Sequence, residues 1–79
     1  MKTFHLTIAS LDKSVFDGFV TRVTVPGSEG EMTILADHVP LISRLSAGTI
    51  TCTDAAGDHT FAVTHGVLEV GASRATILI

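Results

Sequence analysis

The chain has 79 residues, a length that corresponds to one domain. Its formal net charge is −3. Its five basic residues are scattered and form no stripe, so a nucleic-acid partner is not expected. No stretch reaches the roughly 18 apolar residues of a membrane-spanning helix, and no secretory signal is visible, so direct lipid insertion is not expected either.

The chain begins with the alternation of apolar and polar residues that is typical of a half-buried strand. Across residues 3–9, the apolar side chains that point one way are Phe4, Leu6 and Ile8. A polar connection is expected at residues 10–14. The following Asp17-Gly18 step predicts a tight hairpin or a bulge.

Alternation then runs from residue 19 to residue 25, which predicts one continuous second strand that Pro26-Gly27 ends. Residues 31–35 predict a short strand and residues 36–40 a loop. Residues 41–45 fit either a strand or one helical turn, because their period does not distinguish the two.

The second half predicts strands at residues 49–53 and 60–65 around a hairpin loop, and two final strands split by a turn at 71–73. The single cysteine, Cys52, falls on an alternating position and is interpreted as a small buried apolar side chain. Eight or nine short strands with closely spaced turns predict an all-β fold, a flattened sandwich or barrel of two sheets.

The four histidines, at positions 5, 38, 59 and 65, match no metal-ligand spacing. Strand pairing could bring two of them near the first, but nothing in the sequence requires it. Surface or hydrogen-bonded histidines are the simpler interpretation, so no metal and no cofactor are expected.

Catalysis is not expected, although three arrangements deserve comparison. Asp37-His38 could belong to a nucleophilic triad, and Glu29 and Glu31 could act as acid and base. Residues 27–30 do not form a nucleophile elbow. They could form an anion-binding nest, which the two nearby glutamates disfavour, or a solvated loop whose glycines supply positive φ. A domain this small is expected to have little room for a pocket of about 300 Å³ or more.

Five motifs at matching spacing resemble the N-terminal domain of the epsilon subunit of F-type ATP synthase. The most specific are Val-Pro-Gly-Ser-Glu-Gly-Glu-Met-Thr-Ile-Leu at 25–35 and Asp-His-Val-Pro-Leu-Ile at 37–42. Leu-Ser-Ala-Gly-Thr-Ile at 45–50 follows, and residues 11–20 and 66–70 also fit. The resemblance covers essentially the whole chain.

The resemblance implies a flattened β-sandwich of about ten short strands at the foot of the central stalk. Its expected partners are the gamma subunit and the c-ring, and the unit rotates to couple ion translocation to ATP synthesis without catalysis of its own. The implied location is peripheral, on the cytoplasmic face of a bacterial inner membrane.

The resemblance also implies two interfaces, with residues 32–35 as the strand that holds them apart. The ring-facing residues would be Ser28, Glu29, Gly30 and Glu31, with Glu31 favoured for the main contact. The gamma-facing residues would be Ser10, His38, Val39, Pro40, Leu41, Ile42 and Ser43.

Members of the family continue into a C-terminal hairpin of two helices, which can inhibit ATP hydrolysis and in some members binds ATP. Residues 1–79 stop before such a hairpin, so neither helical inhibition nor that nucleotide site is expected. The alternative interpretation is a small soluble β-sandwich module, unrelated to ATP synthase, that binds another protein or a ligand through residues 25–45.

Overall fold

A computed structural model describes residues 2–79, and these fold into nine strands. The described residues contain no helix of the length and apolarity needed to cross a membrane. The strands are β1 (Phe4–Ser10), β2 (Lys13–Val20), β3 (Arg22–Gly27), β4 (Gly30–Leu35), β5 (Leu41–Leu45), β6 (Gly48–Asp54), β7 (Gly57–Val63), β8 (Gly66–Val70) and β9 (Arg74–Leu78).

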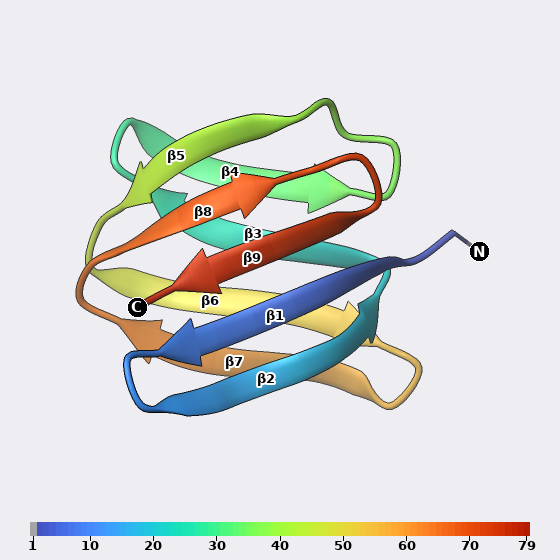
Figure 1. Ribbon diagram of the computed structural model, residues 1–79, viewed down its shortest axis with the longest axis horizontal. Coiled ribbons are helices and arrows are strands. Elements are labelled where there is room, and N and C mark those ends of the chain that lie inside the picture. Colours follow the sequence, from blue (N-terminus) through green and yellow to red (C-terminus); the bar gives the residue numbers. More distant parts are fainter. Residues whose placement is uncertain (1) are drawn as a thin grey trace.

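The strands lie in two layers, as Figure 1 shows. The front layer has the order β2-β1-β9-β8-β5, and the rear layer holds β4, β3, β6 and β7. β1 and β9 run parallel, whereas the other neighbours are antiparallel. Pairing of Gly27 with Leu45 joins the layers into one curled sheet. The predicted all-β flattened sandwich is confirmed.

The core lies between the layers and is built from alternate residues of each strand. It is entirely apolar, with no buried polar side chain among residues 2–79. Its fully buried members include Leu6, Ile8, Val20, Val23, Val25, Ile34, Ile50, Cys52, Leu68 and Ile77. Cys52 is therefore the buried apolar side chain that the sequence predicts, and burial, helped by Asp54 and Asp58, raises the pKa of its thiol.

The prediction of one continuous strand over residues 19–25 is wrong, because the chain turns a corner at Thr21. β2 ends at Val20 with Val20 buried and Phe19 exposed, whereas β3 buries Val23. The inward-facing positions therefore change from even to odd at the corner, where the chain passes from the front layer to the rear one. The Thr21 N–H donates to the carbonyl oxygen of Thr53 at 2.8 Å and fixes this corner.

The predicted turn at Asp17-Gly18 is also wrong. Both residues lie inside β2 and pair with β1, while the turn between these strands occupies residues 11–12. A bulge does occur in β2, but at Val15, where the register shifts between the partners of Ile8 and Ala9. Gly18 is accommodated because β2 is an edge strand, and the ring of Phe16 lies beside it.

Residues 41–45, which the sequence left open between strand and helical turn, form the strand β5. Every residue of β5 pairs with a residue of β8, from Leu41 with Val70 to Leu45 with Gly66. Cross-strand pairing with β8 thus fixes the strand conformation of a segment whose own apolar period is ambiguous.

Candidate functional site

The β3–β4 hairpin presents a tight, exposed tip. Gly27 pairs with Gly30, and Ser28 and Glu29 form the exposed turn between them. Gly30 has φ of +133°, as expected for a glycine in this loop. Gly27 is needed for a different reason, because a Cβ there would lie 2.6 Å from the carbonyl oxygen of Gly30. The Ser28 N–H donates to the Arg44 carbonyl at 2.9 Å, which fixes the tip to β5.

The tip and β5 line one groove of about 550 Å³, formed by residues 28–32 and 41–44. The predicted ring-facing residues therefore lie beside Leu41, Ile42 and Ser43, which were predicted to face gamma. The expectation that residues 32–35 hold these two sets apart is therefore wrong for residues 41–43, whereas residues 38–40 do not line this groove. β5 folds back over the hairpin because it pairs with β3 at Gly27.

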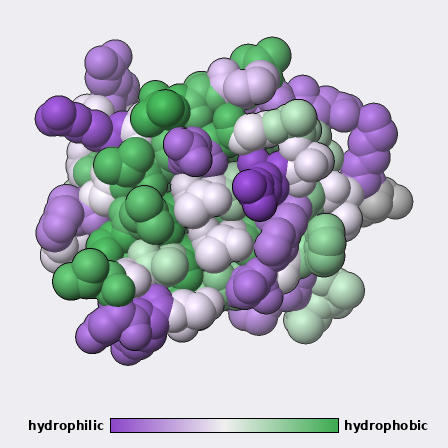
Figure 2. All heavy atoms as spheres, in the orientation of Figure 1, coloured by the Kyte–Doolittle hydropathy of each residue, from purple (hydrophilic) through white to green (hydrophobic). Residues whose placement is uncertain are grey.

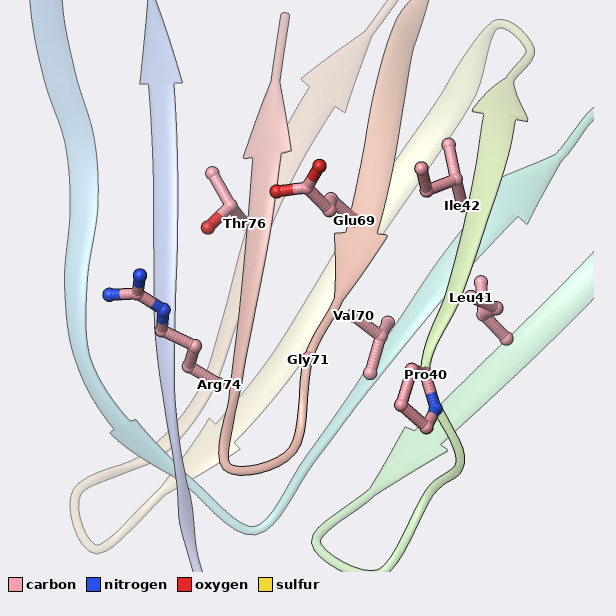
Figure 3. A pocket seen from close by; sticks show the side chains of 8 residues that line it. All are labelled: Pro40, Leu41, Ile42, Glu69, Val70, Gly71, Arg74 and Thr76. Atoms are coloured by element: carbon pink, nitrogen blue, oxygen red, sulfur yellow. The ribbon is translucent and has the colours of Figure 1, made fainter.

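A second groove of about 650 Å³ crosses β5, β8 and β9 (Figure 3). Its lining includes Glu69, Thr76 and Arg74, and the Arg74 side chain extends over β1. Sequence reasoning missed these residues, because only the register of three strands brings them beside β5. The sequence predicts little room for a pocket, and both sites are open grooves rather than enclosed cavities.

Exposed apolar side chains gather on the outer face of the front layer, as Figure 2 shows. Ile42 is 72% exposed and borders both grooves. Leu78 and Val67, which are paired across β8 and β9, are 56% and 41% exposed. Ser10 does not join residues 38–43, because β9 and β8 separate β1 from β5. The Val67–Leu78 pair lies between them on the sheet.

The loop before β5 does not assemble a catalytic triad. The Asp37 carboxylate contacts Lys2 Nζ at 3.0 Å. His38 Nδ1 donates to the carbonyl oxygen of Val39 at 2.6 Å, so the two neighbouring side chains have different partners. Val39 and Pro40 are exposed, which leaves an apolar segment at the start of β5.

The histidines of the strands pair singly with carboxylates. His5 contacts Asp17 across β1 and β2, and His59 Nε2 lies 2.9 Å from Asp54 Oδ2. Within residues 2–79, no three His, Cys, Asp or Glu side chains converge as metal ligands. His59 also packs against the ring of Phe16, so this pair lies where β7 approaches β2.

The Asp54 carboxyl should contribute to acid sensitivity. The hydrogen bond from His59 is the main cause that lowers its pKa, and the Ala56 N–H, which donates at 2.8 Å, adds to it. Because the folded pKa lies below the unfolded value, this stabilisation is present above about pH 4 and is lost as pH falls through the folded pKa. Asp54→Asn should therefore lose less stability on acidification, measured by urea unfolding at pH 6 and pH 3.

His59→Ala provides the matched test of the cause, because it removes the largest contribution to the shift. It should flatten the acid dependence in the same direction as Asp54→Asn. An unchanged pH dependence in both variants would contradict the assignment.

Comparisons with known proteins agree with this architecture. The sequence matches the family described as "ATP synthase, Delta/Epsilon chain, beta-sandwich domain" over residues 3–79. It is 41% identical over 80 residues to the ATP synthase epsilon chain of Xanthomonas oryzae pv. oryzae (strain MAFF 311018), covering 100% of this chain and 57% of the relative. It is 38% identical to the ATP synthase epsilon chain of Bordetella avium (strain 197N), and the match covers 99% of this chain and 56% of that relative. The chain thus spans little more than half the length of these relatives.

Two solved assemblies contain a chain of similar fold. One is the Euglena gracilis mitochondrial ATP synthase OSCP/F1/c-ring structure, with a TM-score of 0.89 at 23% identity over 96% of this chain and 49% of that one. The other is the Tetrahymena thermophila mitochondrial ATP synthase central stalk/c-ring structure, with a TM-score of 0.74 and 23% identity. That match covers 94% of this chain and 60% of the other. At this identity they support the fold. With the match over residues 3–79, the chain belongs to the family of ATP synthase delta/epsilon chain β-sandwich domains.

Proposed function

We propose that the chain is a non-catalytic rotor component of the central stalk of F-type ATP synthase. In this role it links the gamma subunit to the c-ring and couples ion translocation to ATP synthesis. The observation that carries the proposal is the family match over residues 3–79, together with relatives named ATP synthase epsilon chain. These relatives are bacterial, which supports a peripheral position on the cytoplasmic face of the inner membrane.

The exposed tip, residues 28–31, is proposed to face the ring. Glu29 and Glu31 are both exposed there and present two carboxylates to a partner. Complementary charge sets orientation and association rate more than it sets affinity. A ring surface with basic or amide groups would therefore be held in one register by the tip.

Gamma is proposed to bind the shoulder formed by residues 38–43, with Ser10 as a more distant contact. The exposed Val39 and Ile42 supply apolar area of the kind that forms interface cores. Since residues 41–43 share a groove with the tip, the gamma and ring contacts are proposed to meet there. Family membership supports this function over an unrelated protein-binding module.

Charge reversal at the tip tests the proposed ring contact. Glu31→Lys should weaken association with detergent-solubilised c-ring by about 3- to 10-fold at low salt, on the scale of an exposed charge pair. The urea midpoint of the chain should stay the same, because Glu31 is exposed and outside the core. Surface plasmon resonance with immobilised ring measures the affinity.

Glu69→Lys is the matched control, because Glu69 is an exposed strand carboxylate in the other groove. It should leave ring binding within about 2-fold of the parent value, as expected for a charge outside the contact. Equal ring affinity of Glu31→Lys and the parent chain would show that the tip does not make this contact.

A further inference from the structure

We propose that the open edge of β5 receives an extended, basic segment of a partner protein as an additional strand. The segment would lie in the groove between β5 and the acidic β3–β4 tip. This goes beyond the proposed function, because it specifies how the groove binds and which chemistry it selects. It rests on the proposed function only for the identity of the subunit that supplies the segment.

The hydrogen bonds and pairing of β5 show which of its two edges is unpaired. In an antiparallel strand the N–H and C=O of one residue point the same way, and alternate residues point to opposite sides. The Arg44 carbonyl accepts from the Ser28 N–H, so Arg44 points away from β8, and Ile42 points the same way. Among the described residues, the strand pairing of β5 with β3 consists of one residue pair, Leu45 with Gly27. The Ile42 N–H and C=O and the Arg44 N–H therefore face the open groove.

The chemistry of the groove selects a basic segment. Its outer wall carries the carboxylates of Glu29 and Glu31, against the single guanidinium of Arg44, so the net charge of the lining is negative. Met32 and Leu41 add apolar surface to the same groove. An added strand places alternate side chains on one face, so lysines or arginines two residues apart would reach the tip.

The dimensions and exposure of the edge also fit strand addition. The stretch of residues 41–44 that borders the groove is about 13 Å long, at roughly 3.3 Å per residue, which suits three or four residues of a partner. Proteins commonly protect free strand edges with prolines, charges or covering segments. Pro40 and Arg44 flank this edge, yet Ile42 between them remains 72% exposed. Main-chain bonds would supply affinity, and contacts with Ile42 and the tip would supply specificity.

Amide hydrogen exchange, measured by NMR on the parent chain, tests the geometry directly. In the free chain, the Ile42 and Arg44 amides should exchange at least tenfold faster than the Ser43 amide, because Ser43 points towards its β8 partner Leu68. A capped six-residue peptide of alternating valine and lysine is the probe. At saturation it should slow exchange at Ile42 and Arg44 at least tenfold, and a valine–glutamate peptide should not.

A pair of variants separates the backbone contact from the side chain. Ile42→Pro removes an N–H that points away from β8 and should weaken binding of the valine–lysine peptide at least tenfold. Ile42→Thr keeps the N–H and loses only apolar contact, so it should weaken binding of the same peptide by clearly less than Ile42→Pro does. Should Ile42→Pro fail to fold, the exchange measurement on the parent chain still decides. Binding of the basic peptide without slower exchange at residues 42 and 44, or equal binding of both peptides, would overturn the proposal.

Capture of gamma and the c-ring by the parent and by Ile42→Pro distinguishes this inference from the proposed function. Equal capture by both chains would overturn strand addition and leave the proposed function standing. Peptide binding with slowed exchange at Ile42 and Arg44, but without capture of either subunit, would support strand addition and contradict the proposed function.

Discussion

Leu68→Ala should lower the free energy of unfolding by about 2–5 kcal/mol, the range for large-to-small changes in a packed core. Leu68 is 0% exposed and lies at the centre of β8, between Ser43 of β5 and Ile77 of β9. A domain of this length has a net stability of only about 4–12 kcal/mol. The substitution would thus remove much of it, which urea titration followed by circular dichroism would measure.

Leu78→Ala is the matched control, because it removes the same atoms from the next strand of the same sheet. Leu78 is 56% exposed, so the loss should stay below about 1 kcal/mol. Similar losses for the two variants would contradict the assignment of Leu68 to the core and Leu78 to the outer face.

Gly66→Ala should destabilise the chain by about 1–3 kcal/mol, the usual effect of forcing extra atoms into close packing. A Cβ at Gly66 would lie 2.6 Å from the carbonyl oxygen of Leu78 and 3.1 Å from Ile79 Cγ2. The Leu78 contact is with backbone, so β8 and the end of β9 would have to move apart. Chemical denaturation at neutral pH would measure the change.

Gly18→Ala provides the comparison. A Cβ at Gly18 would lie 3.5 Å from the Phe16 ring, which is an ordinary contact. The change should be neutral or stabilising by up to about 1 kcal/mol, because alanine reduces the freedom of the unfolded chain. Equal destabilisation at Gly18 and Gly66 would show that backbone proximity is not the cause.

The strands themselves could be predicted, because one face of each is buried and their apolar residues alternate. Leu6 and Ile8 on β1, and Cys52 on β6, are buried as their spacing indicates. The period-2 signal reports which side of a strand is inside, and that side is the same along each uninterrupted strand.

The corner at Thr21 could not be predicted, because Val20 and Val23 are both apolar β-branched residues. From residue 19 onward, either the even-numbered or the odd-numbered residues could form the buried face. Val20 and Val23 are both buried only because the chain passes into the second layer between them. The wrong turn at Asp17-Gly18 has a similar origin. A dipeptide that favours turns is accommodated in an edge strand when its neighbour, β1, supplies the pairing.

The candidate site was predictable only in part. The tip, residues 28–31, follows from local turn chemistry and from the resemblance, and the structure exposes all four residues. The groove does not follow, because it depends on the pairing of Gly27 with Leu45 and on the pairing of β5 with β8. Such long-range register brings in Glu69 and Arg74, which no local pattern connects with Ile42.

Capture of partner subunits by the chain tests the central-stalk function most directly. An affinity-tagged chain, mixed with purified gamma and detergent-solubilised c-ring, should retain both subunits in one complex. More ring should be lost than gamma between about 50 mM and 500 mM salt, since charge pairs at the tip are screened. A chain that is folded by circular dichroism but retains neither subunit at low salt would contradict the proposed function.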